Sequence, residues 1–147
     1  SLEIMPIIEI YTDGACRGNP GPGGWGALVR IDGTEDSIFG GEANTTNNRM
    51  EMMAAIKALE SIEQSSSITL TTDSSYVKDG LNKWISAWKA KGWKTSTNKP
   101  VKNKDLWLRL DEINQFHEVA WKWVKGHSGH RENEIADMLA NKGIDDL

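Results

Sequence analysis

The order in which strand-like and helical segments follow one another constrains the fold more than any other feature of this sequence. Three short strand-like runs come first, at residues 7–12, 25–31 and 37–43, and the turn residues between them predict an antiparallel meander. A helix predicted over 48–62 and a strand predicted over 68–72 follow. Because a strand, helix, strand order favours parallel pairing, we expect a mixed sheet.

The rest of the chain alternates helices with one further strand. A helical stripe is predicted over 81–92, a helix over 103–115, a strand over 118–124 and a closing helix over 132–142. Three residues of the closing helix are expected to face the core: Ile135, Met138 and Leu139. The expected fold is α/β (α+β mixed), with about five strands in one mixed sheet, three antiparallel and then parallel, and helices on both faces.

The composition excludes several classes of protein. The 147 residues suit one compact domain, and no apolar stretch has the roughly 18 to 20 residues of a membrane span. The single cysteine, Cys16, cannot form an internal disulfide and has no zinc-ligand spacing to other cysteines or histidines. The first residues lack the basic and apolar pattern of a secretory signal, so we expect a cytoplasmic protein.

Charge is distributed unevenly along the chain. The 17 basic and 21 acidic residues give a net charge of -4. Residues 78–104 hold eight lysines and one acid, or +7, which leaves 9 basic and 20 acidic residues, or -11, in the remainder. A basic block inside an acidic protein is typical of a polyanion-binding face beside a metal-binding face. A solvated, lysine-rich surface segment is the alternative interpretation.

Two acids follow predicted strands. Asp13 and Asp73 each stand at the C-terminal end of an apolar run, where ligands of open α/β sheets usually bind. If the two strands are parallel neighbours, the two carboxylates meet. The alternative is that both are turn or helix-capping residues.

Two further acids lie inside apolar helical segments. Glu51 is the only acid between Met50 and Ile56, and Asp137 is the only acid between Ile135 and Ala140. A buried carboxylate needs a partner, and neither segment has a lysine or arginine at helical spacing. The partner is then a cation, hydrogen bonds or another acid, unless the side chains point outward. Four convergent carboxylates favour a hard divalent metal such as Mg²⁺.

One histidine lies close to these acids in the sequence. His127 is flanked by glycines and precedes the helix that bears Asp137. A histidine here could serve a metal site as a proton carrier. A lone surface histidine is the alternative.

Several long motifs together resemble bacterial-type ribonuclease HI over nearly the whole chain. They lie at residues 10–15, 18–24, 45–51, 72–74 and 123–127, with Asn133, Glu134 and Asp137. The resemblance implies the ribonuclease H-like fold and an endonuclease that cuts the RNA strand of RNA/DNA hybrids, leaving 3′-hydroxyl and 5′-phosphate ends. It places Asp13, Glu51, Asp73 and Asp137 at the ligand positions of two Mg²⁺ ions, with Mn²⁺ possible, and gives His127 a role in proton transfer or product release.

The resemblance also implies how the substrate is bound. Contacts to RNA 2′-hydroxyls across the minor groove fall at Cys16, Asn19, Asn47 and Asn48. A basic protrusion at about 81–102 grips the DNA strand through phosphate contacts from Lys89, Lys91, Lys94, Lys99 and Lys102. Trp84 matches an aromatic that packs on a DNA sugar, although its spacing also fits the helix core. The resemblance also implies that Thr46 and Asn103 form a DNA-phosphate pocket.

The sequence departs from the family at two positions. Ser75 stands where a glutamine often contacts the minor groove, and Asn44 stands where an arginine often supports the phosphate pocket. We expect a shortened or water-mediated contact at the first and weaker phosphate binding at the second. Two alternatives stay open, namely the ribonuclease H portion of a larger polymerase and a hybrid-binding module without catalysis. A monomer without an obligate protein partner is the family expectation.

Overall fold

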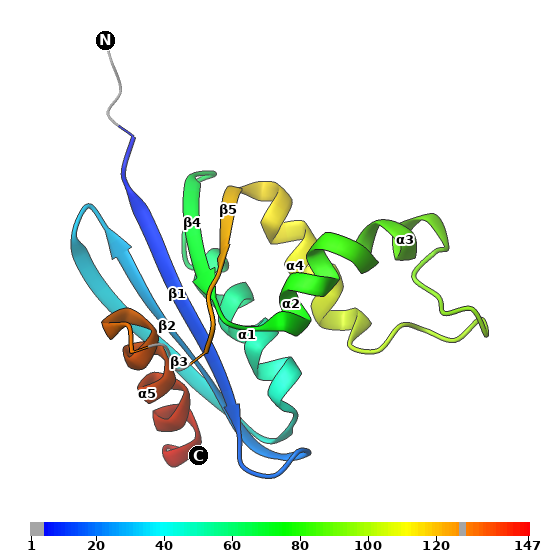
Figure 1. Cartoon of the computed structure of the whole chain (residues 1–147), viewed down its shortest axis with the longest axis horizontal. Coiled ribbons are helices and arrows are strands. Elements are labelled where there is room, and N and C mark those ends of the chain that lie inside the picture. The colour runs from blue at the N-terminus through cyan, green and yellow to red at the C-terminus, as the bar shows by residue number, and fades with distance from the viewer. Residues whose placement is uncertain (1–4, 127–128) are drawn as a thin grey trace.

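One mixed sheet with helices on both faces organises the chain, as the computed structural model in Figure 1 shows. The structure describes residues 5–126 and 129–147. The strands are Ile8–Cys16 (β1), Gly21–Ile31 (β2), Thr34–Thr45 (β3), Ser67–Thr72 (β4) and Glu118–Trp123 (β5). The helices are Asn47–Glu60 (α1), Ser75–Asp79 (α2), Gly80–Trp84 (η1, a π-helix), Ile85–Ala90 (α3), Lys104–Phe116 (α4) and Arg131–Asp145 (α5).

The strands lie in the order β3-β2-β1-β4-β5. Strands β1, β2 and β3 pair antiparallel, whereas β1 with β4 and β4 with β5 pair parallel. The predicted fold class is therefore confirmed. Strand β1 stands where the antiparallel part of the sheet meets the parallel part, so its side chains can meet residues from both.

The helices divide between the two faces of the sheet (Figure 1). Helix α5 packs on β1, β2 and β3, while α1 packs on the sheet together with α4. The main core lies under α1 and α4 and contains Ile10, Met50, Leu70 and Trp107, each fully buried. Helix α1 presents apolar residues nearly all round, as expected for a helix clamped between a sheet and a second helix.

Strand β1 is longer than the sequence predicts. The glycines after residue 12 resemble turn residues in the sequence and predict that the strand ends there. In the structure Gly14, Ala15 and Cys16 continue the strand, because they pair with residues 23–25 of β2. Gly14 instead lets α1 pack closely on the sheet, and Gly24 does the same for α5. Asp13 therefore lies inside a strand and not at its end.

The prediction that Met138 faces the core is wrong. Its side chain is 61% exposed, and α5 packs on the sheet through Ala136, Leu139 and Ala140, with Ile135 half-buried. Small residues face the sheet here because α5 lies close to it. A Cβ atom added to Gly24 would overlap the carbonyl oxygen of Ala140, so no larger side chain fits between the two backbones.

The helical stripe predicted over 81–92 is part of a longer, irregular element. Ser74 caps α2 by accepting a hydrogen bond from the Val77 N–H at 3.1 Å, and the chain then passes through the π-helical turn η1 into α3. Gly80 opens that turn against the indole ring of Trp107, where an added Cβ would collide. Packing against Trp107 therefore accounts for a glycine in mid-helix, which single-helix periodicity does not predict.

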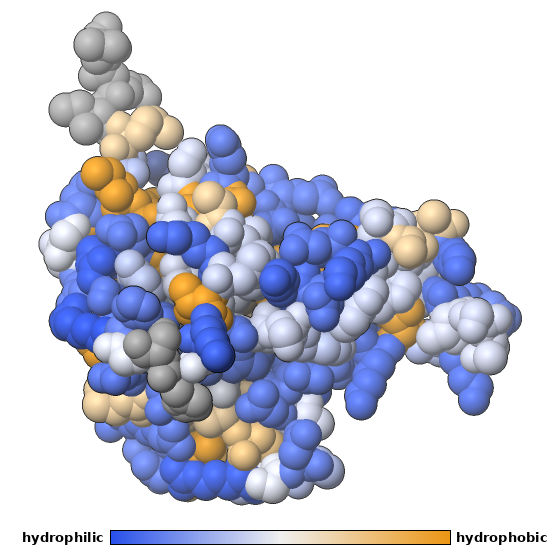
Figure 2. All heavy atoms as spheres, viewed as in Figure 1, coloured by the Kyte–Doolittle hydropathy of each residue, from blue (hydrophilic) through white to orange (hydrophobic). Residues whose placement is uncertain are grey.

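Helix α3 and the segment after it project away from the sheet (Figure 1). Figure 2 shows that the face in view is mostly hydrophilic and that this projecting lobe is largely so. No helix in the described residues is long and apolar enough to cross a membrane.

Candidate active site

Asp13 and Asp73 meet because β1 and β4 run in parallel. The ladder between these strands ends at Tyr11 and Thr71, so Asp13 and Asp73 both stand two residues beyond its last pair. The predicted proximity of the two acids is confirmed, although Asp13 remains paired with Gly26 of β2 on its other side. The candidate site thus lies at the carboxyl ends of the two parallel strands β1 and β4, where ligands of such sheets usually bind.

Glu51 joins these two acids from the first turns of α1. One carboxylate oxygen from each of Asp13, Glu51 and Asp73 lies within 4.8 Å of the others. Gly14 permits this arrangement, because a Cβ atom there would overlap the backbone of Met50 and Glu51. The Gly14 N–H donates to Oε1 of Glu51 at 2.5 Å and to Oδ1 of Asp13 at 2.9 Å.

Glu51 is buried, at 5% exposure, and only one of its two carboxylate oxygens, Oε1, accepts a hydrogen bond from the part of the chain that the structure describes. Its Oε2 atom is buried and has no hydrogen-bond partner among the described residues. A buried polar atom left unpaired costs free energy, so this oxygen favours a ligand. Three convergent carboxylates offer the hard oxygen donors that Mg²⁺ and similar divalent cations prefer, and the residues present therefore fit such a cation.

Burial and mutual repulsion raise the pKa values of these acids. The pKa of Asp13 rises to about 6, chiefly because burial disfavours its charged form, while the hydrogen bond with Glu51 opposes the shift. Burial, followed by the proximity of Asp13, raises the pKa of Glu51 well above its usual value. A cation bound here would reverse this effect by stabilising the charged carboxylates.

Asp137 lies at the same groove, where its side chain interacts with that of Asp13. The groove has a volume of about 440 Å³ and is lined by Asp137 together with the three converging acids. Asp137 is not among the described acids whose oxygens lie within 4.8 Å of one another. Its backbone carbonyl accepts a hydrogen bond from the Asn141 side chain at 3.0 Å. The structure thus brings all four predicted ligands to one groove, with three of them in closest proximity.

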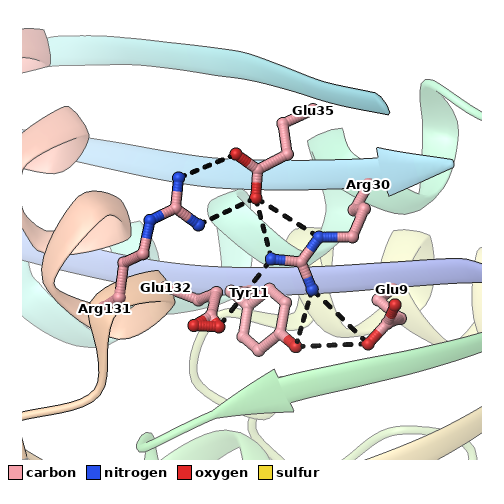
Figure 3. Close-up of polar contacts among 6 residues, drawn as sticks. All are labelled: Glu9, Tyr11, Arg30, Glu35, Arg131 and Glu132. Atoms are coloured by element: carbon pink, nitrogen blue, oxygen red, sulfur yellow. Dashed lines mark hydrogen bonds and ion pairs between the residues drawn. The ribbon is translucent and has the colours of Figure 1, made fainter. Parts of the chain in front are cut away.

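A polar network fixes the start of the helix that carries Asp137 (Figure 3). The Arg131 guanidinium donates to both carboxylate oxygens of Glu35, at 2.9 and 3.0 Å. Glu35 also accepts from Arg30 Nη2 at 2.7 Å, and Arg30 lies 3.8 Å from Glu132. The first turn of α5 is therefore tied to β2 and β3. These residues are not evident from the sequence because their pairing depends on strand register.

The predicted minor-groove residues lie around the same groove. Cys16, Asn47, Asn48 and Ser75 line it, whereas Asn19 does not. Asn19 instead accepts a hydrogen bond from the Asn47 N–H at 3.1 Å, so its side chain holds the start of α1. The amides of Asn47 and Asn48 line the same groove as the carboxylates, and an amide can both donate to and accept from a hydroxyl group.

The predicted phosphate pocket contains an arginine that the sequence analysis did not single out. Thr46 caps α1 by accepting from the Arg49 N–H at 3.2 Å, and the Arg49 guanidinium donates to Asn103 Oδ1 at 3.2 Å. Asn103 also donates to the Tyr76 hydroxyl at 3.0 Å. Arg49 further pairs with Asp105 at 2.8 Å. Thr46 and Asn103 are thus brought together around Arg49, which brings a positive charge that Asn44 lacks.

The protrusion residues are mostly solvent-accessible. Lys89 pairs with Asp111 at 2.8 Å, and the other predicted phosphate-binding lysines of the protrusion are exposed: Lys91, Lys94, Lys99 and Lys102. Trp84 is half-buried and stacks edge-on against Tyr76 with ring centroids 5.5 Å apart. Its surroundings therefore combine core packing with an accessible edge. His127 lies outside the described residues.

The sheet has the strand order β3-β2-β1-β4-β5, and acids from β1, α1 and the end of β4 converge at its parallel edge. These two features together define a protein of the ribonuclease H fold class. The sequence model of the RNase H family matches residues 6–145. Ribonuclease H of Halorhodospira halophila is 57% identical over 145 residues, which cover 99% of this chain and 97% of that relative. The chain belongs to the ribonuclease H family, whose members are endoribonucleases.

Solved structures agree with this assignment. The crystal structure of LC9-RNase H1, a type 1 RNase H with the type 2 active-site motif, matches with a TM-score of 0.88 at 33% identity. That match covers 99% of this chain and 75% of the other. The crystal structure of LC11-RNase H1 in complex with RNA/DNA hybrid has the same fold, with a TM-score of 0.69 at 24% identity over 95% of this chain and 97% of that one.

Proposed function

We propose that this chain hydrolyses the RNA strand of RNA/DNA hybrids, leaving 3′-hydroxyl and 5′-phosphate ends, and that it does so as one domain of residues 1–147. The observation that carries the proposal is the buried Oε2 of Glu51, which lacks a hydrogen-bond partner among the described residues beside the carboxylates of Asp13 and Asp73. A module that only bound hybrids would gain nothing from this destabilising arrangement.

The acids would hold the metal ions. In the proposal Asp13, Glu51, Asp73 and Asp137 hold two Mg²⁺ ions, or Mn²⁺ in their place. Such ions supply an activated water and stabilise the leaving oxygen. The Gly14 N–H holds Oε1 of Glu51 and so fixes the carboxylate, whose other oxygen is buried without a hydrogen-bond partner among the described residues. His127 would move a proton to or from the reacting groups.

The residues around the groove would select and hold the substrate. Cys16, Asn19, Asn47, Asn48 and Ser75 would contact the minor groove, where hydroxyl groups distinguish RNA from DNA. The DNA strand would be held by Thr46, Asn103, Trp84 and the protrusion at about 81–102, through lysines 89, 91, 94, 99 and 102. LC11-RNase H1, a protein of the same fold, has been crystallised in complex with RNA/DNA hybrid, which supports this substrate. We place the protein in the cytoplasm as a monomer without an obligate protein partner.

Cleavage of matched duplexes tests the proposal. A labelled RNA/DNA hybrid is compared with RNA/RNA and DNA/DNA duplexes of the same sequence, with Mg²⁺, with Mn²⁺ and with excess chelator. The proposal predicts cutting of the RNA strand of the hybrid alone, abolished by chelator. Hybrid binding without cleavage in either metal would contradict it and would instead assign the chain as a binding module.

A further inference from the structure

A second hollow continues the active-site groove beyond Asp73. Its volume is about 270 Å³, and it shares Asp73, Ser74 and Ser75 with the groove that holds the acids. The rest of its lining comes from Lys78 and from residues 123–125 at the end of β5. A strand of nucleic acid whose scissile phosphate lay at the acids could therefore extend directly into this hollow.

Two cations stand in this hollow. Lys78 comes from α2 and Lys125 follows β5, and both side chains are exposed. In the ion pairs found across the described residues, Lys83, Lys89 and Lys142 each contact a carboxylate, but neither Lys78 nor Lys125 does. Both charges are thus available to an anionic ligand. Lys125 lies outside the basic block of 78–104, so the charge distribution of the sequence does not reveal it.

The backbone of each lysine is held relative to the metal-binding acids. The Val124 N–H donates to the Thr72 carbonyl at 3.0 Å, and a Cβ atom at Gly126 would lie only 2.8 Å from Oδ2 of Asp73. Lys125 lies between these two contacts. The Lys78 N–H donates to the Ser74 carbonyl at 3.2 Å, one residue after Asp73. The backbone at both lysines is therefore held in place beside Asp73.

We infer that the hollow binds a phosphodiester of the RNA strand adjacent to the scissile one, with Lys78 and Lys125 as its ligands. The inference rests on the proposed function and names a further part of its substrate site. Three neighbouring carboxylates repel a polyanion, and two cations at the next position along the groove offset that repulsion. Lysine contacts to phosphates add affinity without reading sequence.

Binding of hybrid in chelator tests the inference without requiring cleavage. The variant Lys78→Ala/Lys125→Ala is compared with Lys57→Ala/Lys142→Ala, which removes the same two charges from exposed positions outside the hollow. The first variant should lower the slope of log affinity against log salt by about one, because the two lysines neutralise a single phosphate, and weaken binding about tenfold or more. Equal effects of the two variants would overturn the inference.

A single neutral methylphosphonate, scanned along the RNA strand, locates the contact. At one linkage it should weaken binding by the wild type but leave the Lys78→Ala/Lys125→Ala variant unaffected. A loss of the same size in both proteins at every linkage would overturn the inference. With Mg²⁺ restored, the double variant should raise KM and leave kcat within about twofold, because the lysines bind a group that does not react. If wild type shows these binding effects but never cuts the hybrid, the proposed function fails while the inferred phosphate site remains supported.

Discussion

The backbone N–H of Gly14 donates to Oε1 of Glu51 at 2.5 Å, which joins the central strand directly to the helix that packs on it. Oε2 of the same carboxylate is buried without a hydrogen-bond partner among the described residues, and one Glu51 oxygen lies within 4.8 Å of oxygens of Asp13 and Asp73. The close packing depends on the absence of a side chain at residue 14. The geometry of the acids is therefore set by a glycine as much as by the acids.

Gly14→Ala should disable the site by moving α1. The added Cβ would overlap the backbone of Met50 and Glu51, so the helix must shift and carry the Glu51 carboxylate with it. We expect hybrid cleavage to fall about 100-fold, with a stability loss of about 1–3 kcal/mol. Gly33→Ala is the control, because Gly33 has positive φ but no atom within 4 Å of an added Cβ. It should lose stability through backbone strain and retain cleavage; equal cleavage by both variants would refute the role given to Gly14.

Asp13→Asn should stabilise the chain when divalent cations are removed. Burial raises the pKa of Asp13 to about 6, so the folded state holds its proton more tightly than the unfolded chain does. Stability is thus lost as the pH rises from about 4 through 6, and the variant avoids this loss. In chelator at pH 7.5 its free energy of unfolding should exceed that of wild type by on the order of 2 kcal/mol.

The gain from Asp13→Asn should vanish near pH 3.5 and shrink when Mg²⁺ or Mn²⁺ is added. Chemical denaturation at several pH values measures it. A variant less stable than wild type in chelator at pH 7.5 would show that the Asp13 charge is already compensated within the protein.

Glu35→Gln should loosen the start of α5. Two guanidinium groups, those of Arg131 and Arg30, lower the pKa of Glu35 from 4.5 to about 2. The stabilisation by its charge is present above pH 4.5 and is lost as the pH falls toward 2. The variant should melt a few degrees below wild type at pH 7, and that gap should shrink in acid.

Glu60→Gln is a matched control for Glu35→Gln. Glu60 also pairs with an arginine, Arg109, at 2.7 Å, but this pair joins α1 to α4 away from the acids. It should cost less stability, because Glu60 is held by one arginine and not two, and it should leave the Mg²⁺ dependence of cleavage unchanged. The Glu35 variant should need more Mg²⁺, since α5 carries Asp137. The same Mg²⁺ requirement in both variants would show that the Glu35 network does not influence metal binding at the acids.

The sequence predicted those parts of the site that depend on local pattern. Asp13 and Asp73 follow apolar runs of two strands, so their meeting followed once parallel pairing was assumed. Glu51 interrupts an apolar helix, which indicated a buried acid that needs a partner, but its place among the ligands came from the resemblance to the family. Met138 was misplaced because helical periodicity does not show how closely a helix packs, whereas the glycines of β2 bring α5 close enough to favour alanines. The predicted first strand ended too early because the glycines that continue β1 also resemble turn residues.

Other features depend on which residues meet across strands and helices. The contacts of Glu35 with Arg30 and Arg131 require the pairing of β2 with β3 and the docking of α5. Lys78 and Lys125 are 47 residues apart in the chain and meet in one hollow only because β4 and β5 pair in parallel. No spacing rule within a single segment predicts either cluster.

The metal-binding role of Asp13 is tested by measuring hybrid cleavage and hybrid binding of Asp13→Asn side by side with wild type. We expect wild type with Mg²⁺ to cut only the RNA strand, and the variant to bind the same hybrid at least as tightly but not to cut it. Undiminished cleavage by the variant would contradict the assignment of Asp13, Glu51 and Asp73 as the group that holds the metal.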